Sequence, residues 1–533
     1  MSSDKISRHD SDVKDPVEAH DDVKKPSTPE ERQARLKAAM AEDPGLSGWN
    51  ARAIKFYLIV LCITCCSGDS GFDGTVMSGI NAMTQYQHYF GLAEAGPKTG
   101  IVFGIYTIGN LVGAFPASYL PDRIGRRYTM FFGNLVLVIG AILTATANSS
   151  GRFLGGRFLT GFGVACAGAA AKSYLAEVTP PQTRGRYLGI LNSFFYVGQI
   201  TATGMMIGTQ KMQSENSWRL PLYIQAIPAG INVIFIHFCP ESPRWLYTVG
   251  KMDEAKAILA RLHSRDNDIN SPLIRLEVEE IEEHVKIGGA DKTWWDFRPL
   301  FRTKADRARM WMVILIGAFG QLSGNGMITY FLPILLKNAG ITSDSKRITL
   351  NFVNSVTSMI GAVTGAYLVD SFGRRKLLLS STTALVVILA IACGLLSNPG
   401  DNQVRANAGI TFIYLFMVVF SFGWTSMQAL YPAEVLSYQM RAKGLAFLAI
   451  VAQASSCINT FGLPVALSKI GWYVYLIFCI WDLFEVIVIY FTVVETKGLT
   501  LEEIEEVFSQ DDPVKYSIEH NFKAKPEASP SHA

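Results

Sequence analysis

Apolar residues gather in twelve long runs along this chain, and polar residues gather between them. The runs cover residues 53–79, 99–120, 128–147, 153–177, 186–210, 219–239, 309–337, 350–370, 376–396, 408–431, 442–468 and 471–494. Each run is long enough to cross a lipid bilayer as a helix, which takes about 20 mostly apolar residues. A membrane span must satisfy its own backbone hydrogen bonds, so we predict that every run is helical.

The polar stretches divide the chain into five regions. We predict a disordered cytoplasmic tail over 1–52, a six-helix bundle over 53–239, a cytoplasmic helical linker over 240–308, a second six-helix bundle over 309–494 and a cytoplasmic tail over 495–533. The first tail is rich in Asp, Lys, Pro and Ser, which is typical of disorder. Apolar residues recur at helical spacing in Met252–His263 and Leu273–Val285 of the linker and in Leu499–Phe508 of the last tail.

The composition agrees with a protein that sits in a membrane. Apolar residues make up 49% of the 533 residues, charged residues only 17%, and the mean hydropathy is +0.22. Soluble proteins contain roughly 25% charged residues. The net charge of +3 gives no reason to expect a nucleic-acid partner. The eight cysteines lie inside apolar runs, so we expect no disulfide framework.

Two motifs occur twice in the chain. The basic turn Asp122–Arg127 returns as Asp370–Arg375 after 248 residues. A glutamate followed seven positions later by an arginine occurs as Glu177 with Arg184 and again, 257 residues on, as Glu434 with Arg441. Motifs that repeat in the same order at nearly one interval indicate two copies of one structural unit.

The basic residues of the short loops predict the orientation in the membrane. An even number of spans places both termini on one side. The two basic turns lie on that side, together with Arg52, Lys55 and the basic residues of the linker. Lys and Arg are enriched in cytoplasmic loops, so we expect both termini in the cytoplasm and the protein in the plasma membrane.

Ionisable groups interrupt the apolar runs at a few positions. Asp69 and Asp73 lie one helical turn apart in the first run, and Arg157 and Lys172 lie in the fourth. A charge at the centre of a membrane span costs on the order of 3 kcal/mol, so each is a candidate functional residue.

The seventh run is rich in glycine, amides and hydroxyls. Its stretch Gly320–Gly326 holds three glycines, and Tyr330 follows one turn later. Such a helix can bend, and its amides can donate and accept hydrogen bonds, which suits sugar hydroxyls. The same residue types also suit close packing of helices joined by amides. Residue types alone leave both interpretations open.

Seven motifs taken together resemble the sugar porter family of the major facilitator superfamily. They are Asp122–Arg127, Arg157 with Gly161, Glu177 with Arg184, Pro240–Arg244, Asp370–Arg375, Glu434 with Arg441, and Glu495–Gly498. Within that family, Gly71–Gly74, Ser323–Gly326 and Trp424–Pro432 are most similar to fungal-type lactose permeases and cellodextrin transporters. The resemblance implies an all-α fold of twelve spans in two pseudo-symmetric bundles, which rock about a central sugar site.

The resemblance also implies roles for individual residues. The expected substrate-binding residues are Gln321, Asn325, Tyr330, Asn192, Gln199 and Asn459. Asp73 matches the first-helix acid of proton-coupled members, and Arg157 matches the fourth-helix arginine that can pair with it. The conformational gate is expected at Asp122, Arg126, Arg127, Glu177, Arg184, Asp370, Arg374, Arg375, Glu434 and Arg441. By resemblance, ion pairs among these groups latch the bundles in the outward-facing state.

Two departures from the family pattern bear on the cargo. Ala429 falls on a tryptophan position of the tenth helix, and the larger pocket that results favours a disaccharide such as lactose or cellobiose. Lys172 stands where a proline is common, and either pairs with Glu177 or meets an anionic solute.

The sequence therefore predicts proton-coupled uptake of a disaccharide or related sugar by a carrier that functions as a monomer. No enzymatic activity, no metal and no cofactor besides the coupling proton are expected. Transport of a non-sugar metabolite, including efflux, and a non-transporting sugar sensor remain as alternatives. The chain has no Gly-x-x-x-x-Gly-Lys-[Ser/Thr] phosphate loop, which argues against an ATP-driven pump.

Overall fold

The computed structural model describes residues 29–46, 48–180, 183–288, 297–397, 403–437, 440–497, 499 and 501–523. All regular secondary structure in these residues is helical. The N-terminal bundle consists of α2 (Ala51–Asn81), α4 (Pro97–Ala117), α6 (Arg126–Ala145), α7 (Ser150–Val178), α8 (Arg184–Thr209) and α9 (Asn216–Phe235). The C-terminal bundle consists of α13 (Lys304–Leu322), α14 (Asn325–Asn338), α15 (Asp344–Phe372), α16 (Arg374–Leu396), α17 (Gln403–Val435), α18 (Arg441–Ile470) and α19 (Tyr473–Thr492).

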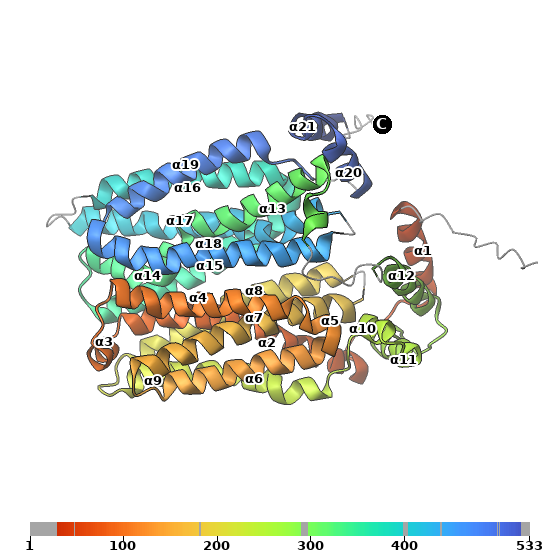
Figure 1. The fold of residues 1–533 in the computed structure, drawn as a ribbon, viewed down its shortest axis with the longest axis horizontal. Helices are drawn as coiled ribbons and strands as arrows, with labels where there is room; N and C mark the ends of the chain where they lie inside the picture. The colour runs from red at the N-terminus through yellow and green to blue at the C-terminus, as the bar shows by residue number, and fades with distance from the viewer. Residues whose placement is uncertain are drawn as a thin grey trace, which may run out of the picture.

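The two bundles lie side by side with their long helices roughly parallel to one axis (Figure 1). Among the described residues, eleven helical segments are long and apolar enough to span a membrane, and they correspond to every predicted span except the fifth. That span is the helix α8, which has 26 residues and packs between α2 and α15. The polar Asn192, Ser193 and Gln199 lower its hydropathy without removing it from the bundle.

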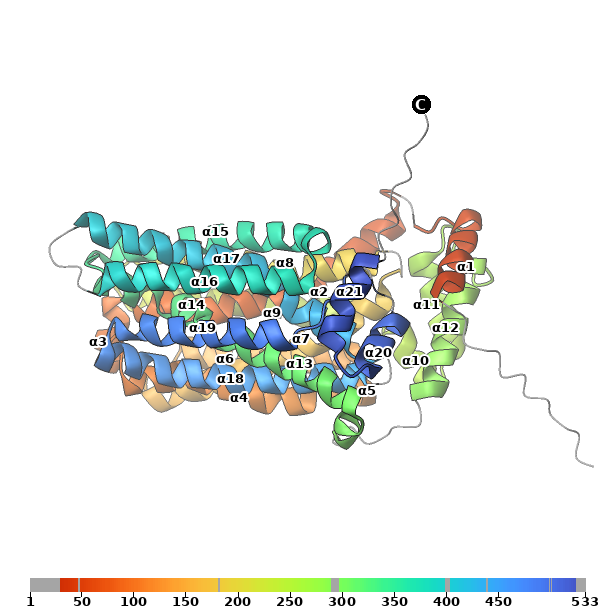
Figure 2. The ribbon, with the colours of Figure 1, turned by 90° about the horizontal axis from the view of Figure 1, so that it is seen from above.

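The bundles have two distinct ends (Figures 1 and 2). We call the end that carries the linker helices and both described terminal segments the linker end. We call the opposite end, where the short helix α3 (Thr84–Phe90) lies, the far end. Successive long helices run between these ends in alternating directions, as twelve spans require.

The seventh predicted span is not one continuous helix. α13 stops at Leu322, and α14 begins at Asn325. Between them Gly324 has a φ of 88°, in the left-handed region that only glycine adopts without strain. A second distortion follows at Phe331, two residues before Pro333. The glycine-rich stretch therefore bends the helix in the middle of the C-terminal bundle.

Glycine is also required in both basic turns. Gly125 and Gly373 have φ values of 96° and 86° and sit directly before α6 and α16. A Cβ atom at Gly125 would lie 2.5 Å from Oε2 of Glu241, and one at Gly373 would lie 2.8 Å from Oε2 of Glu495. The repeat seen in the sequence is thus a repeat of backbone geometry.

The linker forms three helices, α10 (Pro243–Thr248), α11 (Met252–His263) and α12 (Pro272–Gly288). Buried His263 ties them to the N-terminal bundle, because its ring contacts Oε2 of Glu277 at 2.6 Å and the carbonyl oxygen of Val178 at 2.9 Å. Burial lowers the pKa of His263, but Glu277 and the carbonyl outweigh it and the net pKa is raised. The linker also contains Trp294 and Trp295, a residue type that favours the membrane interface, and we expect them to anchor it there; both lie outside the described residues.

The prediction of a disordered tail over residues 1–52 is wrong for its last part. Residues Pro29–Glu42 form the helix α1, which packs on α12. Asp43 follows it and accepts hydrogen bonds from the hydroxyl of Ser271 at 2.6 Å and the amide of Arg265 at 3.0 Å. Composition favoured disorder, but these tertiary contacts order the segment. The last tail holds α20 (Leu501–Ser509) and α21 (Pro513–Lys523).

Candidate functional site

A buried ion pair joins the first and fourth spans. Nη1 of Arg157 on α7 donates to Oδ1 of Asp73 on α2, and both residues are almost fully buried. The Arg157 guanidinium also lies 4.6 Å from the ring centroid of Tyr106 on α4. Removing either partner would leave the other charge buried and uncompensated, which is strongly unfavourable. The two residues predicted for proton coupling are therefore in direct contact.

A second carboxyl lies beside this pair. Asp69 is one turn before Asp73, is 1% exposed, and neither of its oxygens has a hydrogen-bond partner in the described structure. Gln225 on α9 and Thr160 on α7 lie next to Asp73. Gln225 is not among the site residues predicted from the sequence, although an amide inside the sixth apolar run was a visible signal. Two carboxyls thus share one turn of α2 with a single contacting cation.

Three of the predicted substrate residues meet where α13 and α14 separate. Nδ2 of Asn459 on α18 donates to the carbonyl oxygen of Gln321. A Cβ atom added at Gly326 would lie 3.1 Å from Nδ2 of Asn459, so the start of α14 also touches this amide. The buried Oδ1 of Asn325 has no partner among the described residues. This amide oxygen is available to a hydroxyl donor.

Two further predicted residues extend this region toward the N-terminal bundle. The ring of Tyr330 on α14 lies 6.2 Å, centroid to centroid, from that of Phe103 on α4. Gln199 on α8 is 3% exposed, and one turn later Thr203 contacts Ser355 on α15 at 3.4 Å. Asn192 is different: it is exposed on α8, two turns nearer the linker end, and no described contact brings it to the other amides.

The eighth span adds two amides that sequence analysis did not name. Asn351 and Asn354 on α15 are 2% and 1% exposed. Nδ2 of each, and Oδ1 of Asn354, have no partner in the described part of the chain. Unpaired buried amides are uncommon in proteins. Together with Asn325 they offer donors and acceptors that a polyhydroxylated ligand could satisfy.

The first gate motif forms an ion-pair cluster within the N-terminal bundle. The guanidinium of Arg126 contacts Asp122 at 2.9 Å and Glu177 at 3.0 Å. Glu177 also accepts a hydrogen bond from the hydroxyl of Ser242. Glu241 accepts from the backbone amides of Arg126 and Arg127 at 3.1 and 3.2 Å. Burial raises the pKa of Glu241 even though these donors and both arginines oppose it.

The second gate motif repeats this cluster within the C-terminal bundle. Nη2 of Arg374 contacts Glu434 at 2.6 Å, and the hydroxyl of Thr496 donates to Glu434 at 2.6 Å. Glu495 accepts from the backbone amides of Arg374 and Arg375 at 2.8 and 3.2 Å. Thr496 and Glu495 therefore take the places of Ser242 and Glu241, so residues 240–242 and 494–496 are structurally equivalent.

Neither gate glutamate pairs with the arginine that lies seven positions after it in the sequence. Glu177 pairs with Arg126 and not with Arg184, and Glu434 pairs with Arg374 and not with Arg441. Nε of Arg184 and of Arg441 is buried without a partner in the described residues. The side chain of Asp370 lies outside the described part of the structure.

At the far end, ion pairs cross between the bundles. Glu94, in the loop before α4, contacts Nζ of Lys337 at 2.9 Å and Nη1 of Arg347 at 3.1 Å. Arg347 also pairs with Asp344, which accepts from the hydroxyl of Thr84 at 3.0 Å. We call Glu94, Lys337, Asp344 and Arg347 the far-end cluster. Burial raises the pKa of Glu94, but Lys337 and Arg347 outweigh it and the net pKa is lowered.

Lys172 does not pair with Glu177, which is one of its two predicted roles. Both carboxylate oxygens of Glu177 are engaged by Arg126 and Ser242. Lys172 is exposed on α7, and no hydrogen bond or ion pair joins it to a described residue. It lies in the fourth span with no partner among the residues that the structure describes.

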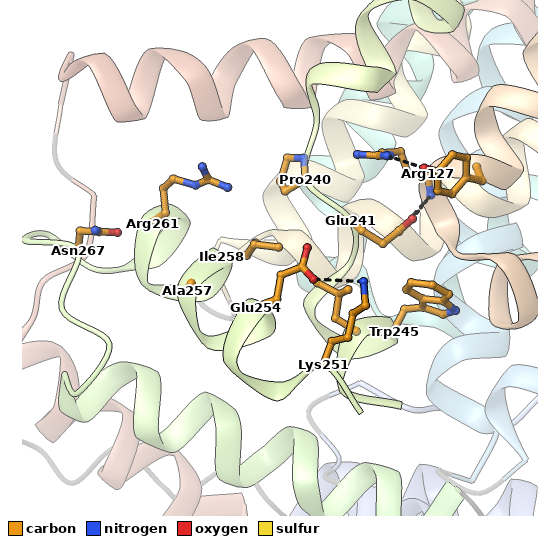
Figure 3. A pocket seen from close by; sticks show the side chains of 12 residues that line it. Arg127, Pro240, Glu241, Trp245, Lys251, Glu254, Ala257, Ile258, Arg261 and Asn267 are labelled. Atoms are coloured by element: carbon orange, nitrogen blue, oxygen red, sulfur yellow. Dashed lines mark hydrogen bonds and ion pairs between the residues drawn. The ribbon is translucent and has the colours of Figure 1, made fainter. Parts of the chain in front are cut away.

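A hollow of about 530 Å³ lies at the linker end, between the start of α6 and the linker helices (Figure 3). Arg127 and Glu241 line one side, and Lys251 and Glu254, 3.5 Å apart, line another. It contains none of the predicted substrate residues. We therefore assign it to the contact between linker and bundle and not to cargo binding.

Comparison with known proteins agrees with this arrangement. The profile of the family described as "Sugar (and other) transporter" matches residues 59–508. The chain is 27% identical over 478 residues to the "High-affinity glucose transporter" of Kluyveromyces lactis, covering 85% of both chains. It is 26% identical over 486 residues to the "Quinate permease" of Emericella nidulans, covering 87% of this chain and 89% of that protein.

A solved structure shares the fold. The inward open conformation of the xylose transporter XylE from E. coli matches with a TM-score of 0.70 at 19% identity, over 85% of this chain and 99% of that chain. The predicted major facilitator fold is therefore confirmed.

Proposed function

The chain belongs to the sugar (and other) transporter family, and we propose that it takes up its sugar together with a proton by alternating access. Family and fold make it a multi-pass membrane transporter of sugars and not an enzyme. The observation that carries the proton coupling is the buried contact of Asp73 with Arg157, with Asp69 one turn away.

Proton coupling needs a carboxyl that changes its partner when it binds a proton. A charged Asp73 holds Arg157 between α2 and α7. Protonation removes that charge, and a hydrogen bond between ionised groups is roughly twice as strong as a neutral one. The weakened tie lets α2 and α7 shift. Asp73 then carries the proton, and Arg157 restores the pair after release.

The arrangement of the bundles supports an inward-facing state. Contacts between bundles lie at the far end and in the middle, as between Glu94 and Lys337 and between Tyr196 and Thr425 at 3.0 Å. At the linker end, Arg126 and Arg374 pair within their own bundles. We place the linker end in the cytoplasm and the protein in the plasma membrane, so that cargo leaves toward the cytoplasm in this state.

We propose a disaccharide such as lactose or cellobiose as the cargo. Ala429 is exposed on α17, where the resemblance expects tryptophan, and a small side chain leaves room for a second ring. Gln321, Asn325 and Asn459 supply amides near the helix break. The Kluyveromyces lactis relative is named for glucose, so the monosaccharide belongs in the same test.

A non-sugar hydroxylated metabolite is the second candidate. The relative named as a quinate permease favours it, and so does Lys172, which has no partner in the described part of the chain. Transport in the outward direction would be compatible with the same fold, because fold alone does not fix direction.

The test is accumulation of labelled lactose, cellobiose and glucose in cells that lack sugar transporters, with and without a protonophore. We expect one of the sugars to accumulate above its external concentration and the protonophore to abolish this. Asp73→Asn should remove accumulation but retain exchange of sugar across the membrane. Asp253→Asn, at an exposed linker position, is the matched control.

Uptake that ignores an imposed pH gradient and survives Asp73→Asn would contradict proton coupling. Accumulation of none of the three sugars would move the assignment to the second candidate.

A further inference from the structure

We infer that Lys172 binds the carboxylate of an anionic, polyhydroxylated cargo, so that the carrier prefers sugar acids to neutral sugars. This inference rests on the proposed transport function and names the class of molecule transported. It depends on three features of the structure: the face of α7 on which Lys172 lies, its counterpart in the other bundle, and the absence of a described partner.

Lys172 lies on the face of α7 that looks toward the C-terminal bundle. Arg157 marks that face, because it sits between α2, through Asp73, and α4, through Tyr106. Both α2 and α4 touch the C-terminal bundle, at α14 and α18. Lys172 follows Arg157 by 15 residues. At 3.6 residues per turn, it is rotated by about 60° and lies about 22 Å nearer the linker end.

The space in front of this face is open. Gly168 lies one turn before Lys172, and a Cβ atom added there would meet nothing within 4 Å. Ala169 and Lys172 are exposed, whereas Ala171, Tyr174 and Leu175 are buried. The same helix therefore packs on one side and faces open space on the side of Lys172.

The other bundle identifies the same position independently. Glu177 and Glu434 occupy equivalent places in the two gate clusters. Counting back five residues from each leads to Lys172 and Ala429. Both are exposed on their helices. The two bundles thus present equivalent positions to the space between them, one with an ammonium group and one with a methyl group.

The charge of Lys172 is not compensated by the described protein. No described residue pairs with it, and Glu177 is held by Arg126 and Ser242. Asp73 is neutralised by Arg157, about four turns away. A neutral sugar offers an ammonium group only ordinary hydroxyl acceptors. A carboxylate offers a charge-assisted hydrogen bond, which is roughly twice as strong.

Hydroxyl recognition and charge recognition are then separate parts of one pathway. Asn325, Asn351 and Asn354 present unpaired amide atoms suited to hydroxyl groups in either kind of cargo. Lys172 distinguishes cargo that carries a carboxylate from cargo that does not. This division predicts that removing the charge changes selectivity without abolishing transport.

The experiment compares matched neutral and acidic cargo in the purified full-length transporter, reconstituted in liposomes. The pairs are glucose with glucuronate and lactose with lactobionate, so that charge varies at two sizes. We expect wild type to prefer the acid of at least one pair. Lys172→Met should weaken uptake of that acid ~10-fold, measured as kcat/KM, and change the neutral sugar less than ~2-fold. Lys172→Arg should restore the acid preference in part.

Lys211→Met is the control, because Lys211 is exposed in the loop between α8 and α9, outside the proposed pathway. It should leave both pairs unchanged. Transport of the neutral sugars with no uptake of either acid would overturn the inference and leave the proposed function standing. Equal loss of acid and neutral uptake in Lys172→Met would also overturn it, since that result indicates a structural role. Absence of uptake for all four compounds would overturn both proposals.

Discussion

The far end and the linker end of the two bundles use charged residues in opposite ways. At the far end, Glu94 of the N-terminal bundle pairs with Lys337 and Arg347 of the C-terminal bundle. At the linker end, Arg126 and Arg374 each pair with a glutamate of their own bundle. Ion pairs therefore hold the bundles together at one end and stiffen each bundle separately at the other.

This difference indicates how the carrier can change state. Opening the far end requires breaking ion pairs between bundles, whereas the linker-end clusters can stay intact while the bundles rock. The helix break at Gly324 lies between the two ends and gives the C-terminal bundle a place to bend. Variants at the two ends should consequently differ in what they change: stability and turnover at the linker end, and the balance of states at the far end.

The largest effect is expected from Arg374→Ala at the linker end. Glu434 would lose its ionic partner in a cluster where the arginine side chain is 10% exposed. Breaking a buried ion pair by removing one partner costs roughly 3–5 kcal/mol. We expect a lower Tm of the purified protein and slower transport, with no change in which cargo is preferred.

Arg126→Ala is the matched variant in the other bundle. Its effect should be of similar size, because Arg126 is 13% exposed and Ser242 donates to Glu177 as Thr496 does to Glu434. A switch in cargo preference from either variant would contradict the assignment of these clusters to conformational change.

The next largest effect is expected from Arg347→Ala in the far-end cluster. Arg347 is 2% exposed and pairs with both Glu94 and Asp344, so its loss removes two ion pairs at once. We expect the population open at the far end to rise ~10-fold, which corresponds to about 1.4 kcal/mol. Spin labels at Lys98 and Lys346, exposed on α4 and α15, would report a longer distance.

Lys211→Ala controls for loss of a positive charge at the same end, and should leave that distance unchanged. If Arg347→Ala leaves it unchanged as well, the far-end cluster does not hold the bundles together.

The fold was predictable from the sequence because a membrane span has a direct signature in apolar length. The position of the helix break was also predictable, since Gly324 of the glycine-rich stretch Gly320–Gly326 lies between α13 and α14. The partner of each gate glutamate was not predictable. The repeated motif contains Glu177 and Arg184 but does not name a partner for either, and the fold brings Arg126 on α6 to Glu177, 51 positions away. Which charge meets which depends on helix packing that a linear motif does not contain.

The far-end cluster could not be predicted for a related reason. Glu94 lies 243 and 253 positions from its partners Lys337 and Arg347. Each residue alone looks like an ordinary solvated loop charge. For the candidate cargo site, the usable sequence signal was an amide side chain inside an apolar run. Applied to every run, this signal would also have identified Gln225 and Asn354 as candidates. The substrate roles of all these amides stay predictions.

The pH dependence of the far end follows from Glu94. Its pKa is lowered from the usual 4.5, since Lys337 and Arg347 outweigh the effect of burial, and Asp344 is the other acid in the cluster. A lowered pKa means that the carboxylate stabilises the closed far end above pH 4.5 and that this stabilisation is lost as the pH falls through the lowered pKa. We expect acidification of the far side below that range to lengthen the same spin-label distance.

Glu94→Gln should produce the lengthened distance at neutral pH and remove most of its further change on acidification. An unchanged pH response in Glu94→Gln would assign the titration to another group, and Asp344→Asn would then be examined first.

The smallest effect is expected from Lys337→Ala. The Lys337 side chain is 51% exposed, and an ion pair in contact with solvent contributes about 0–1 kcal/mol. Glu94 would keep Arg347, so the far end should stay closed and transport should change less than ~2-fold at physiological salt.

Measured together, Lys337→Ala, Arg347→Ala and the double variant form a double-mutant cycle around the carboxylate of Glu94. If Lys337→Ala opens the far end as much as Arg347→Ala does, net positive charge near Glu94 matters and the buried geometry of Arg347 does not. If Arg347→Ala alone opens the far end, the closed state depends on a buried arginine that has two partners. The far end and the linker end then differ in mechanism as well as in position, because the clusters at the linker end each lie within one bundle.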